Sequence, residues 1–165
     1  ELSACDRLIL PGVGAFLPAM EILSNLGLDT FIQEWTKDGK SILGICLGMQ
    51  LLFSQSEENG VTNGLGLIPG NVSSLKNSKR KVHIGWNNVE PIRSNSLISD
   101  SGYAYFVHSF ACLPENESHI IAKTNYGESF ASAIQNKHVL GVQFHPEKSQ
   151  DFGLSILRRF SLGEI

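Results

Sequence analysis

A tight turn around Cys46 is the feature that most constrains how this chain can fold. Cys46 lies in Gly44-Ile45-Cys46-Leu47-Gly48, directly after the apolar run Ser41-Ile42-Leu43 and before residues 49–53 (MQLLF). The residues before the cysteine favour a buried strand, and those after it favour a helix. Glycines on both sides allow the chain to turn sharply without Cβ clashes. The sequence therefore predicts a strand that turns into a helix at a cysteine.

The position of Cys46 indicates a nucleophile. The turn resembles the nucleophile elbow G-x-S-x-G, with cysteine in place of serine. Backbone N–H groups at the start of the following helix are expected to favour the thiolate, which is the species that attacks a carbonyl carbon. A buried, unreactive cysteine is the alternative, and the second half of the chain argues against it.

A second motif supplies a base and a carboxylate. The strand-like run Gly141-Val142-Gln143-Phe144 ends at His145, and Glu147 follows two residues later. A thiol nucleophile needs an imidazole that takes up its proton, and the imidazole needs a partner that fixes its tautomer. Cys46, His145 and Glu147 are therefore a candidate catalytic triad, since a sheet brings distant strand ends to one edge. A structural histidine is the alternative.

These two motifs resemble a known family. Residues 44–50 (GICLGMQ) and 141–149 (GVQFHPEKS) resemble the two halves of the active site of the triad-type class I glutamine amidotransferases. Further blocks resemble the glutaminase subunits of imidazole glycerol phosphate synthase and extend the resemblance over essentially the whole chain. These blocks are residues 11–16 (PGVGAF), 64–70 (GLGLIPG), 85–87 (GWN), 105–110 (YFVHSF) and 124–127 (TNYG).

The resemblance implies a fold and a set of site residues. The expected fold is α/β and flavodoxin-like, with a mostly parallel sheet flanked by helices and an antiparallel extension. The implied oxyanion hole consists of Gly12, Val13, Gly14 and the backbone N–H of Leu47. The residues implied at the amino-acid end of the substrate are Gln50, His108, Ser109 and Phe110, and for His108 and Ser109 a structural role is equally open. The residues implied at a partner interface are Lys148, Trp86 and Asn87, with a solvated lysine as the alternative for Lys148.

The resemblance also implies the reaction and the partner. Cys46, His145 and Glu147 would hydrolyse glutamine to glutamate and ammonia without a metal or an organic cofactor. The ammonia would pass to a (β/α)₈-barrel cyclase, bound as the other half of a heterodimer. That subunit would make imidazole glycerol phosphate and AICAR, the aminoimidazole carboxamide by-product, in histidine biosynthesis.

Other functions stay open at the level of sequence. A paralogous amidotransferase subunit would supply ammonia to a sugar-modifying partner in surface-polysaccharide biosynthesis. A stand-alone hydrolase of glutamyl substrates would need no partner, and a non-catalytic partner-binding module would carry an unactivated Cys46. His83 follows Val82 where the resemblance leads us to expect a proline, which weakens the pathway assignment more than the chemistry.

Length and composition agree with a globular enzyme subunit. The 165 residues predict a single glutamine amidotransferase domain over residues 1–165, with 42% hydrophobic residues to fill a core. A net charge of −3 gives no reason to propose nucleic acid or a membrane as a partner. Three cysteines, an odd number, indicate a reducing compartment. Neither a membrane-spanning run nor a leader peptide is evident, so we expect a cytoplasmic protein.

The hydrophobic pattern predicts β-α-β order first and short strands later. The first elements are a strand at 7–10, helices at 16–26 and 28–37, and the strand that leads into Cys46. The later strands are predicted at 72–75, 82–89, 103–108, 120–124, 130–134 and 139–144, followed by a helix at 151–162.

The resemblance further implies that a strand, a helix and a second strand precede Glu1 in the family. We therefore expect Glu1 not to be the natural N-terminus and the chain to be incomplete there. Strands of a parallel sheet are buried on both faces, so the isolated chain is expected to expose apolar surface and to aggregate.

Overall fold

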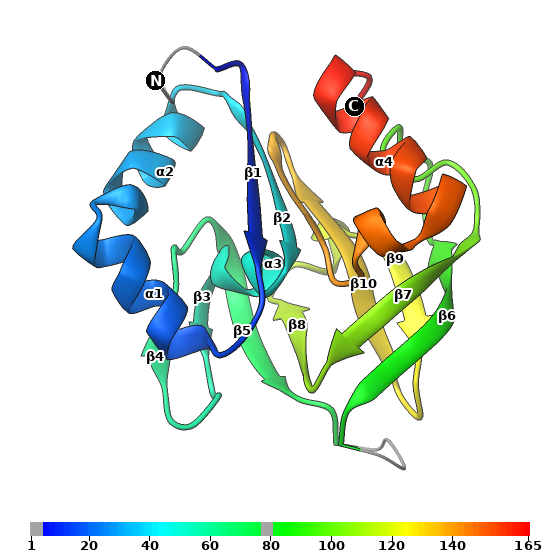
Figure 1. The fold of residues 1–165 in the computed structure, drawn as a ribbon, viewed down its shortest axis with the longest axis horizontal. Helices are drawn as coiled ribbons and strands as arrows, with labels where there is room; N and C mark the ends of the chain where they lie inside the picture. Colours follow the sequence, from blue (N-terminus) through cyan, green and yellow to red (C-terminus); the bar gives the residue numbers. More distant parts are fainter. Residues whose placement is uncertain (1–4, 77–80) are drawn as a thin grey trace.

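A seven-stranded mixed sheet is the main element of the computed structural model, which describes residues 5–76 and 81–165 (Figure 1). The strand order is β1-β2-β11-β10-β9-β6-β7. The bounds in that order are Arg7–Gly12, Ser41–Cys46, Val139–Val142, Ser129–Asn136, Ile120–Asn125, His83–Pro91 and Gly102–His108. The predicted strands are all present, with ends that differ by a few residues.

A smaller four-stranded sheet packs beside it, in the order β4-β3-β5-β8. Its strands are Thr62–Asn63, Phe53–Ser56, Ile68–Ser74 and Phe110–Pro114. The sequence analysis predicted only β5 among these. The other three are short, and their polar residues do not alternate with apolar ones over enough positions to give a period-2 signal.

Helices cover both faces of the main sheet (Figure 1). They are α1 (Phe16–Asn25), α2 (Leu28–Lys37), α3 (Leu47–Leu51) and α4 (Gln150–Leu162), with 3₁₀ turns η2 (Glu117–His119) and η3 (Pro146–Lys148). The predicted helices are confirmed to within one residue at each end. In Figure 1, α1 and α2 lie on the side of β1, and α4 lies on the other side of the sheet.

The predicted α/β class is confirmed, but the sheet is mixed rather than mostly parallel. Parallel pairing joins β1 to β2 and β2 to β11, whereas β11-β10, β10-β9, β9-β6 and β6-β7 are antiparallel. The physical reason is the length of the connections. Only Lys137 and His138 separate β10 from β11, and so short a turn can join only antiparallel strands.

Strand β2 lies between two hydrophobic cores. Its neighbouring residues Ile42 and Leu43 are both fully buried, yet Ile42 belongs to the core that includes Phe16 of α1 and Leu43 to the core that includes Phe160 of α4. Successive side chains of a strand point to opposite faces, and helices cover both faces here. The end of β2 is therefore held firmly from both sides, and Cys46 is its last residue.

The turn at Cys46 depends on close backbone contacts. Cys46 itself has φ 53° and ψ −111°, a strained conformation for a residue with a side chain. A Cβ atom on Gly48 would lie 1.7 Å from the carbonyl oxygen of Leu10, and one on Gly44 would lie 2.7 Å from the Gly48 backbone. The two glycines let β1, β2 and α3 meet at distances that no other residue allows.

We expect Gly48→Ala to destabilise the protein by about 3 kcal/mol or more, because its new methyl group would overlap a backbone oxygen. The matched control is Gly39→Ala, where φ is +79° but nothing lies within 4 Å of the new Cβ. That variant should lose only about 1 kcal/mol, from backbone strain. Urea unfolding of both variants measures the difference. Equal losses would show that the close approach at Gly48 does not matter.

Candidate active site

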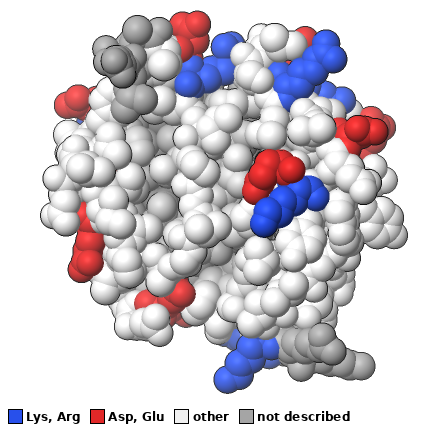
Figure 2. All heavy atoms as spheres, viewed as in Figure 1, with Lys and Arg blue, Asp and Glu red and all other residues white. Residues whose placement is uncertain are grey.

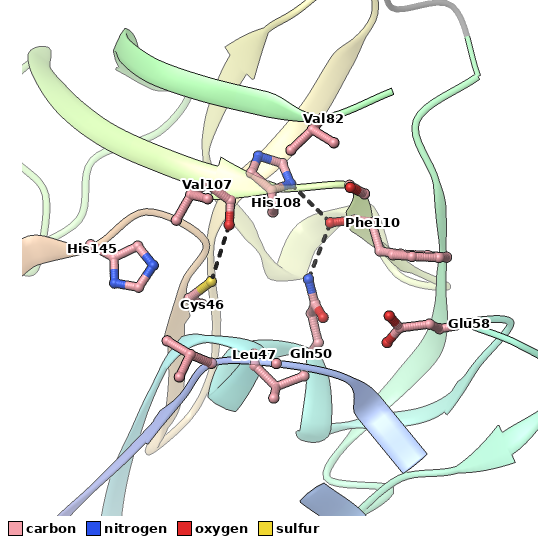
Figure 3. A pocket seen from close by; sticks show the side chains of 12 residues that line it. Cys46, Leu47, Gln50, Glu58, Val82, Val107, His108, Phe110 and His145 are labelled. Carbon is pink, nitrogen blue, oxygen red and sulfur yellow. Dashed lines mark hydrogen bonds between the residues drawn. The ribbon is translucent and has the colours of Figure 1, made fainter. Parts of the chain in front are cut away.

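A cavity of about 370 Å³ opens at the end of β2, where β1, α3 and the β7-β8 connection meet (Figure 3). Cys46 and His145 lie at one end of it in Figure 3, and Glu58 lies at the other. The lining residues are Val13, Gly14, Cys46, Leu47, Gln50, Glu58, Val82, Val107, His108, Ser109, Phe110 and His145.

The imidazole of His145 has a defined tautomer. Its Nδ1 lies 2.8 Å from Oε1 of Glu147, and a carboxylate can only accept, so Nδ1 carries the proton. Nε2 then has a free lone pair. Within the described residues, this buried nitrogen has no hydrogen-bond partner. The structure thus brings His145 and Glu147 together as predicted and leaves a basic nitrogen at the cavity.

Hydrogen bonds to β7 hold the backbone of His145 in place. Its N–H donates to the Tyr105 carbonyl at 2.9 Å, and its own carbonyl accepts from the Ser149 hydroxyl at 2.6 Å. The same hydroxyl accepts from the Tyr105 N–H at 2.9 Å. The hydroxyl therefore bridges strand and loop, and a shift of the His145 backbone would break the two of these bonds that it makes.

The thiol of Cys46 is buried and protonated at rest. Burial raises its pKa to about 11, and the nearby charge of Glu147 adds to the rise. The Leu47 N–H and the Gln143 side chain lower the pKa by less. The thiol donates to the Val107 carbonyl at 3.8 Å, so the S–H bond must turn away from Val107 before its proton can reach His145.

The backbone N–H after Cys46 favours the thiolate as expected, since the Leu47 N–H lowers the pKa, but burial raises the pKa by more. The sequence analysis relied on the N-terminus of the following helix, but α3 is only five residues long. So short a helix has a small dipole, and its effect is weaker than the loss of solvation inside the protein.

Three of the four predicted oxyanion-hole residues line the cavity. Val13 and Gly14 lie in the turn after β1, Gly14 with φ +99°, and Leu47 follows the cysteine. Gly12 lies behind them, paired in register with Cys46, and is not part of the cavity wall. Val13 is 80% exposed, so the peptide groups of this turn have room to reorient.

All four residues predicted at the amino-acid end of the substrate line the same cavity. The ring of His108 is nevertheless occupied within the protein, since Nδ1 lies 2.9 Å from the Phe110 carbonyl and Nε2 lies 3.0 Å from His83. Of the two roles left open for His108, these contacts favour the structural one.

The residues predicted at a partner interface differ in their surroundings. Trp86 is 49% exposed, and Lys148 is exposed with Nζ 5.9 Å from the ring centre of Tyr105. The amide of Asn87, in contrast, bonds internally to His83 and to the Asn125 carbonyl. Asn87 is thus less available to a partner than its neighbour Trp86.

Two residues of the site were not found from sequence. Gln143 is fully buried and donates to the Cys46 sulfur at 3.8 Å; its only signal was a polar residue inside the apolar run before His145. Among the described residues that line the cavity, Glu58 is the only one with a carboxylate, and its Oε2 accepts from the Phe16 N–H at 2.8 Å. It lies in a polar loop with no signal of its own.

The described residues lack two further features, a metal-binding cluster and a membrane-spanning helix. They contain no group of three or more His, Cys, Asp or Glu side chains placed to hold a metal ion. Among the described helices, none has both the length and the apolar character needed to cross a membrane.

Comparison with known proteins agrees with the geometry. The family model of class I glutamine amidotransferases matches residues 3–162. The imidazole glycerol phosphate synthase subunit HisH of Chlorobaculum tepidum is 45% identical over 166 residues, covering 98% of this chain and 83% of the relative. The chloroplastic imidazole glycerol phosphate synthase hisHF of Arabidopsis thaliana is 49% identical, covering 97% of this chain, which spans 28% of that longer protein.

The fold of this chain is also similar to that of a solved protein. A crystal structure of a glutamine amidotransferase superposes with a TM-score of 0.76 at 20% identity, covering 99% of this chain and 80% of the other. With Cys46 and His145 at one cavity, the hydrogen bond between His145 and Glu147, the family model and these sequence identities, the chain belongs to the class I glutamine amidotransferases, among the relatives of the HisH subunits of imidazole glycerol phosphate synthase.

Proposed function

We propose that residues 1–165 act as one glutamine amidotransferase domain that hydrolyses glutamine through Cys46, His145 and Glu147. The observation that carries this is that the buried Cys46 thiol and His145 line the same cavity. Among the described residues, Nε2 of His145 has no hydrogen-bond partner, and Nδ1 lies 2.8 Å from Oε1 of Glu147, which fixes the tautomer. This is the arrangement that an acyl-transfer nucleophile requires.

In the first step, His145 takes the proton of Cys46 as the sulfur attacks the side-chain amide carbon of glutamine. A C–S bond forms, and the carbonyl oxygen becomes an oxyanion. The N–H of Leu47 and the turn at Val13 and Gly14 would donate to it; one such donor is typically worth roughly 10²–10³ in rate. His145 then gives the proton to the nitrogen as the C–N bond breaks, which releases ammonia and leaves a glutamyl thioester.

In the second step, water attacks the thioester carbon, and His145 Nε2 takes one proton from the water. The C–S bond breaks, and His145 returns this proton to the departing sulfur, which gives glutamate and the free thiol. Glu147 holds the imidazole in the same tautomer throughout and stabilises it while it is protonated. In the first step, the transfer of the thiol proton to His145 is necessary, because the high pKa of Cys46 leaves little thiolate at neutral pH.

The amino-acid end of glutamine would lie toward Gln50 and Glu58. Glutamine carries an ammonium group and a carboxylate, and the Glu58 carboxylate in the cavity wall suits the ammonium. In Figure 3, Glu58 lies far from Cys46, which suits glutamine because its reactive amide and its ammonium lie at opposite ends of the molecule.

We propose a (β/α)₈-barrel cyclase as the partner, because ammonia released into neutral water becomes ammonium, which is no nucleophile. The Arabidopsis relative carries the name of the synthase in one chain and extends well beyond the matched region. Exposed Ile84, Trp86 and Tyr103 lie on β6 and β7, close to exposed Lys148, and would offer a docking face. In Figure 2 the charged groups of the face drawn lie mostly around its margin, with a largely uncharged centre.

The compartment stays a prediction. A reducing environment such as the cytoplasm would keep the Cys46 thiol reduced. The chloroplastic name of the Arabidopsis relative describes that protein.

Substitution of the triad should affect turnover unequally. We expect Cys46→Ala to lower glutaminase kcat by at least ~10⁴-fold in the presence of the cyclase, with His145→Ala close behind and Glu147→Gln at ~10²-fold. Glutamine should still bind to Cys46→Ala. Ammonia release and calorimetric titration measure the two effects. Turnover by Cys46→Ala at the wild-type rate would refute the mechanism.

The negative charge of Glu58 should strengthen the binding of glutamine. Glu58→Gln keeps a side-chain oxygen for the Phe16 N–H but removes the negative charge, so KM for glutamine should rise roughly 10- to 100-fold, the value of a hydrogen bond to a charged group. The matched control is Glu57→Gln, because Glu57 bonds instead to Asn71. An unchanged KM in Glu58→Gln would place the ammonium elsewhere.

Alkylation should report the raised pKa of Cys46. In a Cys5→Ser background, the rate with iodoacetamide should rise about tenfold per pH unit from pH 7 to 10, because only thiolate reacts and the pKa is about 11. Fully buried Cys112 should stay unmodified. Glu147→Gln should shift the profile to lower pH. A rate that levels off below pH 9 would contradict a pKa of about 11.

A further inference from the structure

A line of buried hydrogen bonds begins at Asn87 on β6 and enters the active site. Nδ2 of Asn87 lies 3.2 Å from Nε2 of His83, and Nδ1 of His83 lies 3.0 Å from Nε2 of His108. Nδ1 of His108 lies 2.9 Å from the Phe110 carbonyl. None of these contacts has a role in the proposed chemistry, and only His108 and Phe110 line the cavity.

The line continues from Phe110 to the nucleophile. The Phe110 carbonyl also accepts from Nε2 of Gln50 at 3.1 Å, as drawn in Figure 3. The same nitrogen lies 3.3 Å from Oε1 of Gln143, whose Nε2 donates to the Cys46 sulfur at 3.8 Å. A continuous set of hydrogen bonds therefore joins Asn87 to the thiol.

Elementary hydrogen-bond chemistry fixes the direction of each bond. A carbonyl only accepts, so Nδ1 of His108 carries a proton, and in a neutral ring its Nε2 must accept. Nδ1 of His83 must then donate to it, which leaves Nε2 of His83 to accept from the Asn87 amide. One arrangement of protons satisfies all four groups.

Both rings are held in the neutral form. His83 and His108 are buried, and burial lowers the pKa of His83 to about 4 and that of His108 to about 3. His83 also stacks on Phe106 and Tyr126, with ring centres 4.6 and 4.1 Å away. Its plane is therefore fixed by the two aromatic rings, and its proton by its two hydrogen-bonding neighbours.

We propose that His83 and Asn87 are positioning residues that set the orientation of the Gln50 amide. Both protons of the Gln50 nitrogen are used inside the protein, by Phe110 and Gln143. Only Oε1 of Gln50 is then left to face a ligand, and as an acceptor it suits the ammonium of an amino acid. This role rests on the proposed glutaminase function and adds residues outside the cavity wall to substrate recognition.

The test compares two substitutions of His83 in the full-length protein with its cyclase partner. His83→Phe keeps a ring between Phe106 and Tyr126 but removes both nitrogens. His83→Asn places an amide N–H where Nδ1 was and can still donate to His108. The matched control is His138→Phe, because His138 is also a hydrogen-bonded histidine, but its Nε2 bonds to the Thr36 carbonyl, away from the cavity.

We expect His83→Phe to raise KM for glutamine by about tenfold, the typical effect of one buried hydrogen-bond partner, and to change kcat much less. His83→Asn should restore most of the affinity, and His138→Phe should leave both constants unchanged. If His83→Phe folds and keeps the wild-type KM, or if His83→Asn is no better than His83→Phe, the positioning role is wrong.

A spectroscopic measurement decides the matter even if His83→Phe does not fold. Nitrogen-15 NMR of the unsubstituted protein at pH 7 should show His83 and His108 as neutral rings protonated at Nδ1. Protonation of either ring at Nε2 instead would overturn the proposal. Failure of the proposed function gives a different result, since the unsubstituted protein would then release no ammonia from glutamine with its partner, and the role in recognition would fall with it.

Discussion

The close approach of β1, β2 and α3 is the constraint on which the rest of the site depends. Gly48 lies against the Leu10 carbonyl and Gly44 lies against Gly48, so the chain can reverse within a few residues and hold Cys46 at φ 53°. Such a conformation costs of order 1–3 kcal/mol and persists only where the surroundings enforce it. Here they do, because β2 is covered by helices on both faces and cannot relax. The thiol is thereby presented at the end of a central strand, where the cavity opens.

Burial of that thiol shapes the chemistry. A cysteine exposed at a helix terminus would ionise readily and would also be oxidised or alkylated readily. In the proposed mechanism, the Cys46 thiol, with its pKa raised to about 11, is protected at rest and becomes a nucleophile only as His145 removes its proton. The bond of Nδ1 to Glu147 prepares for this step, since it leaves Nε2 as the nitrogen toward the cavity, without a hydrogen-bond partner among the described residues. Reactivity would thus depend on the thiol and the base acting together.

Polar groups behind the cavity complete the arrangement. Burying His83, His108 and Gln143 is costly unless each polar atom finds a partner, and the hydrogen bonds described above supply most of those partners. Satisfying them leaves a single arrangement of protons. The same bonds that offset the cost of burial therefore also fix the direction of the Gln50 amide, so stability and recognition depend on one set of contacts.

Local sequence determined much of this protein. The turn at Cys46 could be predicted from the glycines around it and the apolar run before it, and the base from the spacing of His145 and Glu147. These features depend only on neighbours along the chain, as do the predicted strands and the helices α1, α2 and α4. The short strands β3, β4 and β8 were not predicted, because too few residues alternate in them. Only the tertiary structure decided the pKa of Cys46, the line of bonds from Asn87 to the thiol and the place of Glu58. Each of these depends on burial or on a distance between residues far apart in sequence, and a linear pattern contains neither quantity.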